Sequence, residues 1–559
     1  MARKPTVGSC TVPAEIRALK PQGVSCFVKK IRNSYYVYEH LRVPDSKRPG
    51  KLKNASGRCI GKIEGGAFIS NNQDNTAIRD LDLEAKDYGE YAAALACSAD
   101  VLEKLKKVFS TEDSIKIYVL GIIYFVESYV PASYIKDIFD QSILSNKWPT
   151  LPFSENIVGE FLRALGRHSM TLEKFQQLLV NESSGYTALD GHVILSCSKE
   201  NDLADYGNKY SKIGNRQLNL MLAYDVESNQ PLTSKAFDGA LPDKSAVSEW
   251  FETFNFKTNT TFIVDMGFYA EDNLSLYRSN EFYFVVPVPD NTILAKMAKE
   301  SISFTGSFQY NKTYENGKDA SDTVLYREFT VKELEDLAQR IANEKVEKDY
   351  QERLKEYEAD PVGKRKPRTH KAKQISRSEY QSDKVILLRN ETMHRKMRDE
   401  YLSQIGQDNV HTQEKYEELE PLFGVIVLRS NKTESAEQIY STYKKRRKIE
   451  THYQHIRNGA DFNGLQTEDY YSMQGLSFIL LIEGLIYRRF IDKLRSAPSA
   501  YVNHMSVKEC LRKLRHAKVS LHTDKRWYGN KVTTRTNQLL TEMGVLWAED
   551  LRKLGSDTL

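Results

Sequence analysis

The stretch IYSTYKKRRKIETHYQHIR, residues 439–457, places one acid inside a run of cations. On a continuous α-helix, Tyr443, Arg446 and Arg457 lie within an arc of roughly 60° around Glu450. A carboxylate binds a hard divalent cation, whereas arginine forks grip phosphate oxygens. The shared helix face therefore indicates metal-assisted chemistry on a nucleic-acid backbone. A solvated basic helix with ordinary ion pairs gives the same pattern and stays open as the alternative at this point.

A second acid stands inside an apolar run. Residues 186–195, YTALDGHVIL, are rich in strand-forming side chains and carry Asp190 in their middle. A carboxylate buried there requires a partner charge or a metal ion, so Asp190 is a candidate metal ligand. An Asp-Gly pair between apolar runs is also a strong hairpin signal, and a turn at Asp190 and Gly191 is the alternative.

A third acid follows a run typical of a buried strand. Residues 260–264 read TTFIV, Asp265 comes next, and a helix is predicted to open near Glu271. Acids at the carboxyl ends of strands in α/β sheets lie where ligands bind. Asp265 is therefore a further candidate ligand, with a loop or helix-capping role as the alternative.

With these motifs in this order, the chain resembles the DDE transposases of bacterial and archaeal insertion sequences, in the group with the Tyr-Arg-Glu-Lys (YREK) signature. The motifs that carry the resemblance are Leu189-Asp190-Gly191-His192, Val264-Asp265-Met266-Gly267-Phe268-Tyr269 and Tyr443-x2-Arg446-x3-Glu450-x6-Arg457. The resemblance covers most of the chain from Gly185 to about Arg515. It departs at two positions: Arg457 replaces the final Lys of the signature, and Met266 stands where relatives often carry a basic residue.

The resemblance implies an α/β protein with an RNase H-like core, a mixed five-stranded sheet with flanking helices that is interrupted by an insertion. The implied catalytic and metal-binding residues are Asp190, Asp265 and Glu450. They would hold two Mg²⁺ ions, with Mn²⁺ able to substitute. The implied DNA-binding residues are Tyr443, Arg446 and Arg457. His192, beside Asp190, is expected to pack or to support the site rather than to act as a base.

The activity implied by the resemblance is cut-and-paste excision at terminal inverted repeats of double-stranded DNA, followed by strand transfer into target DNA. A homodimer is expected in the DNA complex. Two other classes of protein stay open. An RNase H-like, structure-specific nuclease would use the same acids without joining ends, and a domesticated DNA-binding protein would keep the fold without activity. The intact set of acids argues against the second of these.

Composition indicates a folded, multidomain protein. The chain has 559 residues, of which 40% are hydrophobic and 11% aromatic, and this argues against a disordered chain. The formal net charge of +5 is small for this length but uneven. Residues 488–526 hold eleven Lys or Arg against three acids, and residues 444–457 hold six against one. These clusters predict a polyanionic partner.

Several sequence features point to a reducing compartment. The six cysteines form no CxxC pair and have no histidines at zinc spacing, so neither a disulfide framework nor a zinc site is indicated. The N-terminus lacks the apolar stretch of a signal peptide. The apolar runs at 117–129 and 476–487 are too short to cross a bilayer and are predicted to be core helices. We expect a cytoplasmic protein, nucleoid-associated when bound to DNA, with no membrane partner.

The order of these patterns predicts six parts. They are a β-rich segment over 1–78, a helical domain for DNA-end binding or assembly over 79–182, the first part of the core over 183–290, an insertion over 291–420, the second part of the core with the Glu450 helix over 421–495, and a basic helical region over 496–559. Within the first part, a hairpin is predicted around Arg32. Two helices over 154–179 fit either a helix-turn-helix or plain bundle packing. The insertion is predicted to hold a hairpin, a charged helix over 331–358 and a basic loop over 363–371.

Overall fold

The structure is a computed structural model of the chain. It describes residues 12–44, 52–71, 84–128, 130–195, 201, 204–206, 216–239, 241, 243–313, 319–360, 365–407, 410–459, 469–522, 527–545 and 547. The chain forms two compact units. One contains Met1–Lys86, Lys518–Lys531 and Ala548–Leu559, and the other contains Asp87–Ala517 and Val532–Trp547. The finer division into six parts stays a proposal.

The first unit is built on an antiparallel sheet of four strands that follow one another in sequence. They are β1 (Cys26–Ile31), β2 (Ser34–Pro44), β3 (Leu52–Glu64) and β4 (Ala67–Ser70). The hairpin predicted around Arg32 is formed by β1 and β2, and Arg32 adopts a positive φ of 55° in the turn. One face of the sheet buries Cys26, Val37 and Ile63 beneath the short helix α1 (Ala14–Ala18).

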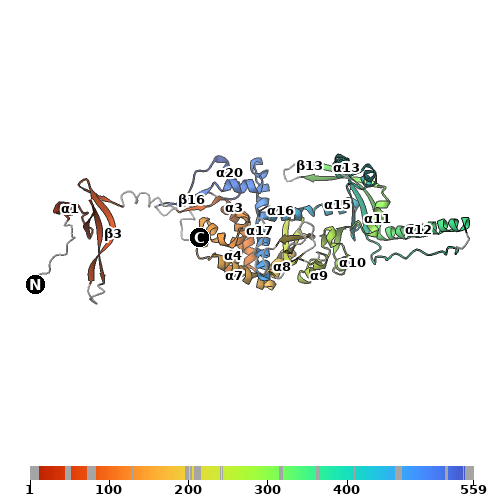
Figure 1. Ribbon diagram of the computed structural model, residues 1–559, viewed down its shortest axis with the longest axis horizontal. Helices are drawn as coiled ribbons and strands as arrows, with labels where there is room; N and C mark the ends of the chain where they lie inside the picture. The colour runs from red at the N-terminus through yellow and green to blue at the C-terminus, as the bar shows by residue number, and fades with distance from the viewer. Residues whose placement is uncertain are drawn as a thin grey trace. The chain divides into compact units, whose positions relative to one another are not determined.

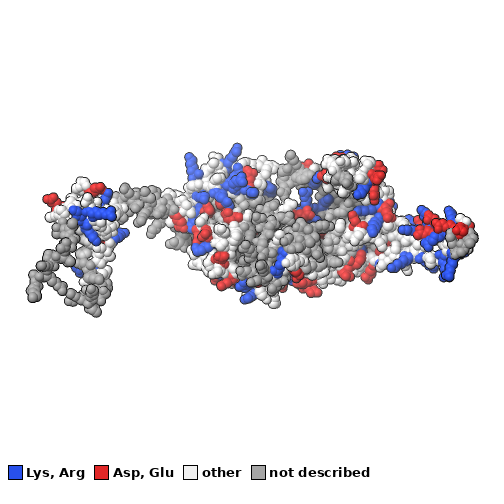
Figure 2. Space-filling view, viewed as in Figure 1, with Lys and Arg blue, Asp and Glu red and all other residues white. Residues whose placement is uncertain are grey.

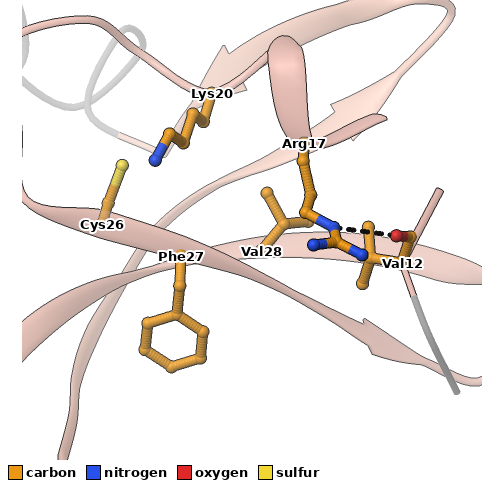
Figure 3. A pocket seen from close by; sticks show the side chains of 6 residues that line it. All are labelled: Val12, Arg17, Lys20, Cys26, Phe27 and Val28. Atoms are coloured by element: carbon orange, nitrogen blue, oxygen red, sulfur yellow. Dashed lines mark hydrogen bonds between the residues drawn. The ribbon is translucent and has the colours of Figure 1, made fainter. Parts of the chain in front are cut away.

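An open pocket of about 340 Å³ lies beside α1, lined by Val12, Arg17, Lys20, Cys26, Phe27 and Val28. Figure 3 shows Phe27 pointing away from Arg17 and Lys20, because neighbouring residues of a strand face opposite sides of a sheet. A separate three-stranded sheet has the order β17-β16-β5. Its strands are β5 (Ala85–Asp87), β16 (Lys518–Leu521) and β17 (Trp527–Gly529).

The second unit contains a mixed sheet of ten strands among the described residues, whereas the resemblance implied a core sheet of five. Its first strands are β6 (Tyr186–Leu195), β7 (Asp205–Tyr206), β8 (Arg216–Asp225) and β9 (Gln230–Asp238), and they pair antiparallel. After helix α9 (Asp243–Thr253) come β10 (Thr261–Ile263), helix α10 (Glu271–Ser279) and β11 (Tyr283–Pro287). Strand β10 runs parallel to both β6 and β11, so it lies between the antiparallel strands and the rest of the sheet.

The predicted insertion extends this sheet instead of standing apart from it. Strands β12 (Gly306–Thr313), β13 (Asp319–Thr330) and β14 (Lys384–Asn390) continue the order β12-β13-β14-β15-β11. The strand that follows the insertion is β15 (Val425–Ser430), and it pairs with both β14 and β11. Helices α11 (Ile293–Glu300) and α12 (Val331–Ala359) cover one apolar cluster of these strands. Helices α13 (Glu391–Gln404) and α14 (Gln413–Leu419) complete the insertion. The predicted hairpin and charged helix are both confirmed.

The remaining helices build a layer around the long helix α17 (Tyr470–Arg495), as Figure 1 shows. They are α3 (Gly89–Lys106), α4 (Thr111–Glu127), α5 (Ala132–Gln141), α6 (Leu144–Lys147), α7 (Glu155–Arg167), α8 (Ser169–Asn181), α18 (Ala500–Asn503), α19 (Val507–Leu514) and α20 (Thr534–Glu542). The two runs predicted as core helices lie in α4 and α17, whose apolar side chains are buried. Within the described residues no single helix is long and apolar enough to cross a membrane. Taken together, the bent pair of α4 and α5 has the length and composition of a membrane span.

Two glycines let α7 and α17 touch through their backbones. A Cβ added to Gly166 of α7 would lie 1.9 Å from Tyr471 O, and one added to Gly475 of α17 would lie 2.1 Å from Leu162 O. Helix α8 buries Leu172, Phe175 and Leu179. Bundle packing therefore accounts for the apolar stripes of α7 and α8, which were also compatible with a helix-turn-helix.

We predict that Gly166→Ala destabilises the protein by about 3 kcal/mol, because a methyl group cannot fit against the main chain of Tyr471 without separating the helices. Gly159, on the same helix, is the matched control, since a Cβ there meets nothing within 4 Å. Gly159→Ala should stabilise by about 0.5–1 kcal/mol through helix propensity. Urea denaturation measures both, and equal effects at the two positions would contradict the close helix contact.

Candidate active site

Asp190 lies in the middle of β6, opposite Leu222 of β8. Its carboxylate accepts a hydrogen bond from Gly191 N at 3.0 Å, and its side chain is 19% exposed. Because β6 runs without interruption from Tyr186 to Leu195, the predicted strand is confirmed and the alternative of a hairpin turn at Asp190 is wrong. An acid inside a paired strand has a fixed backbone, so its position depends little on loop motion.

Asp265 follows the carboxyl end of β10. Its carboxylate accepts a hydrogen bond from Met266 N at 2.8 Å and caps the short helix η2 (Met266–Phe268). Its side chain is 48% exposed, whereas Val264 before it is fully buried. The strand that ends near Asp265 and the helix that begins at Glu271 are both as predicted. Asp265 caps η2 and still exposes part of its carboxylate to solvent.

The expected continuous helix around Glu450 is wrong. The segment forms α15 (Ala436–Lys444) and α16 (Arg447–Gly459), with Lys445 and Arg446 in a turn between them. Main-chain bonds join residues three apart, from Arg446 N to Tyr443 O at 3.0 Å and from Ile449 N to Arg446 O at 3.0 Å. Such 3₁₀-type bonds tighten the chain, so angular positions counted at 3.6 residues per turn do not carry across the break.

Helix α16 is attached to the strand that carries Asp190. The Tyr453 hydroxyl donates to Asp190 O at 3.0 Å, with Leu220 O at 3.2 Å as a second acceptor. The His192 ring lies 5.1 Å from the Tyr453 ring, which agrees with the packing role expected for this histidine. Sequence reasoning missed Tyr453, although its offset of three residues places it near Glu450 on the same helix.

The Arg446 guanidinium lies between the three predicted acids. Its Nη1 is 3.7 Å from Asp190 Oδ2, its Nη2 is 3.9 Å from Asp265 Oδ1, and the same Nη2 hydrogen-bonds to Glu450 Oε1. The Arg446 side chain is only 13% exposed. Burial lowers the pKa of Arg446, but the attraction of Asp265, Asp190 and Glu450 outweighs it and raises the pKa above the ordinary value. The structure thus brings the three acids and one signature arginine together.

The other two predicted DNA-binding residues, Tyr443 and Arg457, lie on α15 and α16. Tyr443 lies beside Arg446, and burial raises its pKa while the guanidinium opposes that rise. Arg457 belongs to α16, but its side chain lies outside the described residues. Lys448 is not a free surface cation, because its ammonium donates to Val226 O at 2.5 Å.

A second arginine that the sequence analysis missed supports the turn after Asp265. Arg429 of β15 is fully buried and donates to Tyr269 Oη at 3.0 Å, to Glu271 at 2.7 Å and to Ser378 Oγ at 3.1 Å. It also pairs with Asp383 at 2.9 Å, just before β14. Burial lowers the pKa of Arg429, but Tyr269, Asp383 and Glu271 together raise it. The signal in the sequence was a lone arginine at the end of the apolar run of β15.

The donor set has the chemistry of a site for hard divalent cations. Within the described residues no three His, Cys, Asp or Glu side chains lie close enough to share one metal ion. Three carboxylates nevertheless surround one guanidinium, so negative charge exceeds positive charge at this point. Carboxylate oxygens are the ligands that Mg²⁺ and Mn²⁺ prefer. The residues therefore fit such an ion.

Comparisons with known proteins agree with this chemistry. Residues 184–482, more than half of the chain, match the family described as transposase DDE domain. None of the curated proteins that were compared matches the chain. A cryo-EM structure of the piggyBac transposase synaptic complex with hairpin DNA is similar at 10% identity and a TM-score of 0.34, over 86% of this chain and 85% of that chain. That likeness is too distant to support an argument. The comparison that bears on this chain is therefore the family match over residues 184–482, together with the site itself.

We predict that Arg429→Met lowers the free energy of unfolding by about 3 kcal/mol, because Asp383 and Glu271 lose the cation that faces them. The Asp383 side chain is 2% exposed and keeps Arg278 as its other ion-pair partner. The matched control is the exposed Arg447, where Arg447→Met should change stability by less than about 0.5 kcal/mol. Urea denaturation measures both variants, and an equally small loss at Arg429 would contradict its role in holding the Asp265 turn.

Proposed function

This chain belongs to the family of transposases with a DDE domain, and we propose that it catalyses cut-and-paste transposition of an insertion sequence. The observation that carries the proposal is the meeting of Asp190, Asp265 and Glu450 around Arg446. These acids come from a strand interior, a strand end and a helix, so the fold itself fixes their arrangement. Phosphoryl transfer between DNA strands requires such a group of hard ligands beside a cation that binds phosphate.

The order of elements supports assignment of an RNase H-like core to this chain. Three antiparallel strands, β6, β8 and β9, are followed by helix, strand, helix and strand, with β10 placed parallel beside β6. An RNase H-like fold requires this order of elements. We further assign the chain to the YREK group of prokaryotic insertion sequences, with Arg457 in place of the final Lys. A cytoplasmic location, with association to the nucleoid through DNA, belongs to the same proposal.

Asp190, Asp265 and Glu450 are proposed to hold two Mg²⁺ ions, for which Mn²⁺ can substitute. When bound, the ions polarise the scissile phosphate and activate the attacking oxygen. The protein holds the first carboxylate on β6 and the second in the turn that Arg429 supports. Tyr453 sets the distance between the third carboxylate and β6, because it ties α16 to Asp190 O.

The proposed DNA contacts come from Tyr443, Arg446 and Arg457, which would bind phosphates next to the scissile bond. The position of Arg446 among the acids supports this role, because its guanidinium lies within 4 Å of Asp190 and Asp265. In the reaction, water first attacks a phosphodiester at the end of the element and frees a 3′-hydroxyl. That hydroxyl then attacks a phosphodiester of target DNA, so each step exchanges one P–O bond for another.

The assembly is proposed to be a homodimer on two terminal inverted repeats of double-stranded DNA. The helical region over 79–182 is proposed to contribute to end binding or to assembly. Its helices pack around α17, which follows the Glu450 helix in the chain.

We predict that Asp190→Asn, Asp265→Asn and Glu450→Gln each abolish strand cleavage and leave DNA-end binding largely intact, because an amide keeps the shape but loses the ligand charge. The assay uses a duplex that carries the element's terminal repeat and flanking DNA, with Mg²⁺. It measures cleavage and joining on gels, and binding by fluorescence anisotropy.

Asp272→Asn is the matched control, because Asp272 is an exposed acid at the start of α10, just after the Asp265 turn. It should keep cleavage near the wild-type rate. Near-normal cleavage by Glu450→Gln would remove the central claim. Cleavage without any joined product in the wild type would instead indicate a nuclease that uses the same acids.

A further inference from the structure

The insertion carries a basic segment that the proposed chemistry does not use. After α12 the chain returns through residues 365–373, RKPRTHKAK, which we call the strap. The strap includes residues 365–371 of the predicted basic loop, whose residues 363 and 364 lie outside the described residues. It contains five Lys or Arg and no acid, namely Arg365, Lys366, Arg368, Lys371 and Lys373.

The strap runs beside a helix that projects from the sheet. In α12 the buried side chains are Val331, Leu334, Glu335 and Ala338, and none is buried from Gln339 to the helix end. The returning chain is tied to this helix, since Ile375 N donates to Gln339 Oε1 at 2.9 Å. Farther out, Pro367 and Arg368 line a small pocket with Val346 and Tyr350 of the helix. The helix and the strap together form an arm, which extends away from α16 in Figure 1.

The five cations of the strap are exposed and carry no ion pair, although acids are near. Helix α12 has nine Asp or Glu against six Lys or Arg. Arg377, just beyond the strap, pairs with Asp336 at 2.6 Å. Over residues 365–373, which are all described, no salt bridge or hydrogen bond of these five side chains is formed. In Figure 2 Lys and Arg gather on the lower edge of the arm's projecting end, where the strap returns in Figure 1.

We infer that the strap is a docking surface for the phosphate backbone of duplex DNA, independent of base sequence. Five like charges held together repel one another, and this repulsion is relieved when a polyanion binds. An extended segment of this length spans up to about 26 Å, which is about the rise of eight base pairs along the axis of duplex DNA. The inference goes beyond the proposed function, because it concerns DNA bound by a surface that holds none of the three acids.

The composition of the strap selects duplex DNA among polyanions. The strap contains no Phe, Tyr or Trp, so it offers no platform on which unpaired bases could stack. It contains no large aliphatic side chain either, and insertion into a lipid surface requires such residues. Lys and Arg on an irregular segment contact phosphates without reading base edges. The DNA held here is therefore bound for its charge, as target or flanking DNA is.

The test is the salt dependence of binding to a random-sequence duplex of about 30 base pairs, measured by anisotropy in EDTA with the full-length protein. The variant is R365Q/K366Q/R368Q/K371Q/K373Q. Each lost phosphate contact should make the slope of log K against log salt shallower by about 0.9, so a change of about 3 to 4 is expected. Because no divalent cation is present, the result does not depend on strand cleavage or on the three acids.

The matched control removes five cations from the helix of the same arm, as K332Q/R340Q/K345Q/K348Q/K355Q. It should change the slope by less than about 1, and unaltered circular dichroism of both variants shows that folding is kept. An unchanged slope in the strap variant, or an equal change in both variants, would overturn the inference. A different result with vesicles of anionic phospholipid would also overturn the inference. That result is wild-type protein that binds the vesicles and a strap variant that no longer binds them but keeps its DNA binding.

Discussion

The site depends on the attraction between the Arg446 guanidinium and three carboxylates. Opposite charges about 4 Å apart attract by a few kcal/mol near a protein surface, and Arg446 lies 3.7 Å from Asp190, 3.9 Å from Asp265 and in hydrogen-bond contact with Glu450. Arg446 supplies the positive charge from a turn between two helices, where its side chain reaches all three acids. The strand interior, the strand end and the helix that carry the acids are positioned around it. The three carboxylates that hold the Arg446 guanidinium would also attract a divalent ion.

Two contacts outside this group hold its parts in place. Tyr453 joins α16 to the main chain of Asp190, and Arg429 joins β15 to the turn after Asp265. Through Asp383 and Ser378, Arg429 also ties the end of the insertion to that turn. Since β12, β13 and β14 continue the central sheet, the insertion supports the site as well as presenting the arm. A substitution in the insertion can therefore disturb the acids without touching them.

The acids and their strands could be predicted because each depends on local pattern. An acid inside an apolar run of strand-forming residues and an acid after a buried strand both stand out without any knowledge of the fold. The break at Lys445 and Arg446 could not be predicted, since a run of cations is compatible with a helix and the break accompanies long-range contacts of Arg446. Arg429 escaped for a similar reason: its partners Tyr269, Glu271 and Asp383 come from distant segments. The pairing of β14 with β15 is equally non-local, so the sequence did not show that the inserted strands continue the sheet.

The most direct test of this account is the number of Mn²⁺ ions bound to the protein on a terminal-repeat duplex, measured by electron paramagnetic resonance. The account predicts about two Mn²⁺ ions for each wild-type active site and none in the triple variant D190N/D265N/E450Q. Binding of the same number of ions by both proteins would contradict it, because the three acids around Arg446 would then not be the metal ligands.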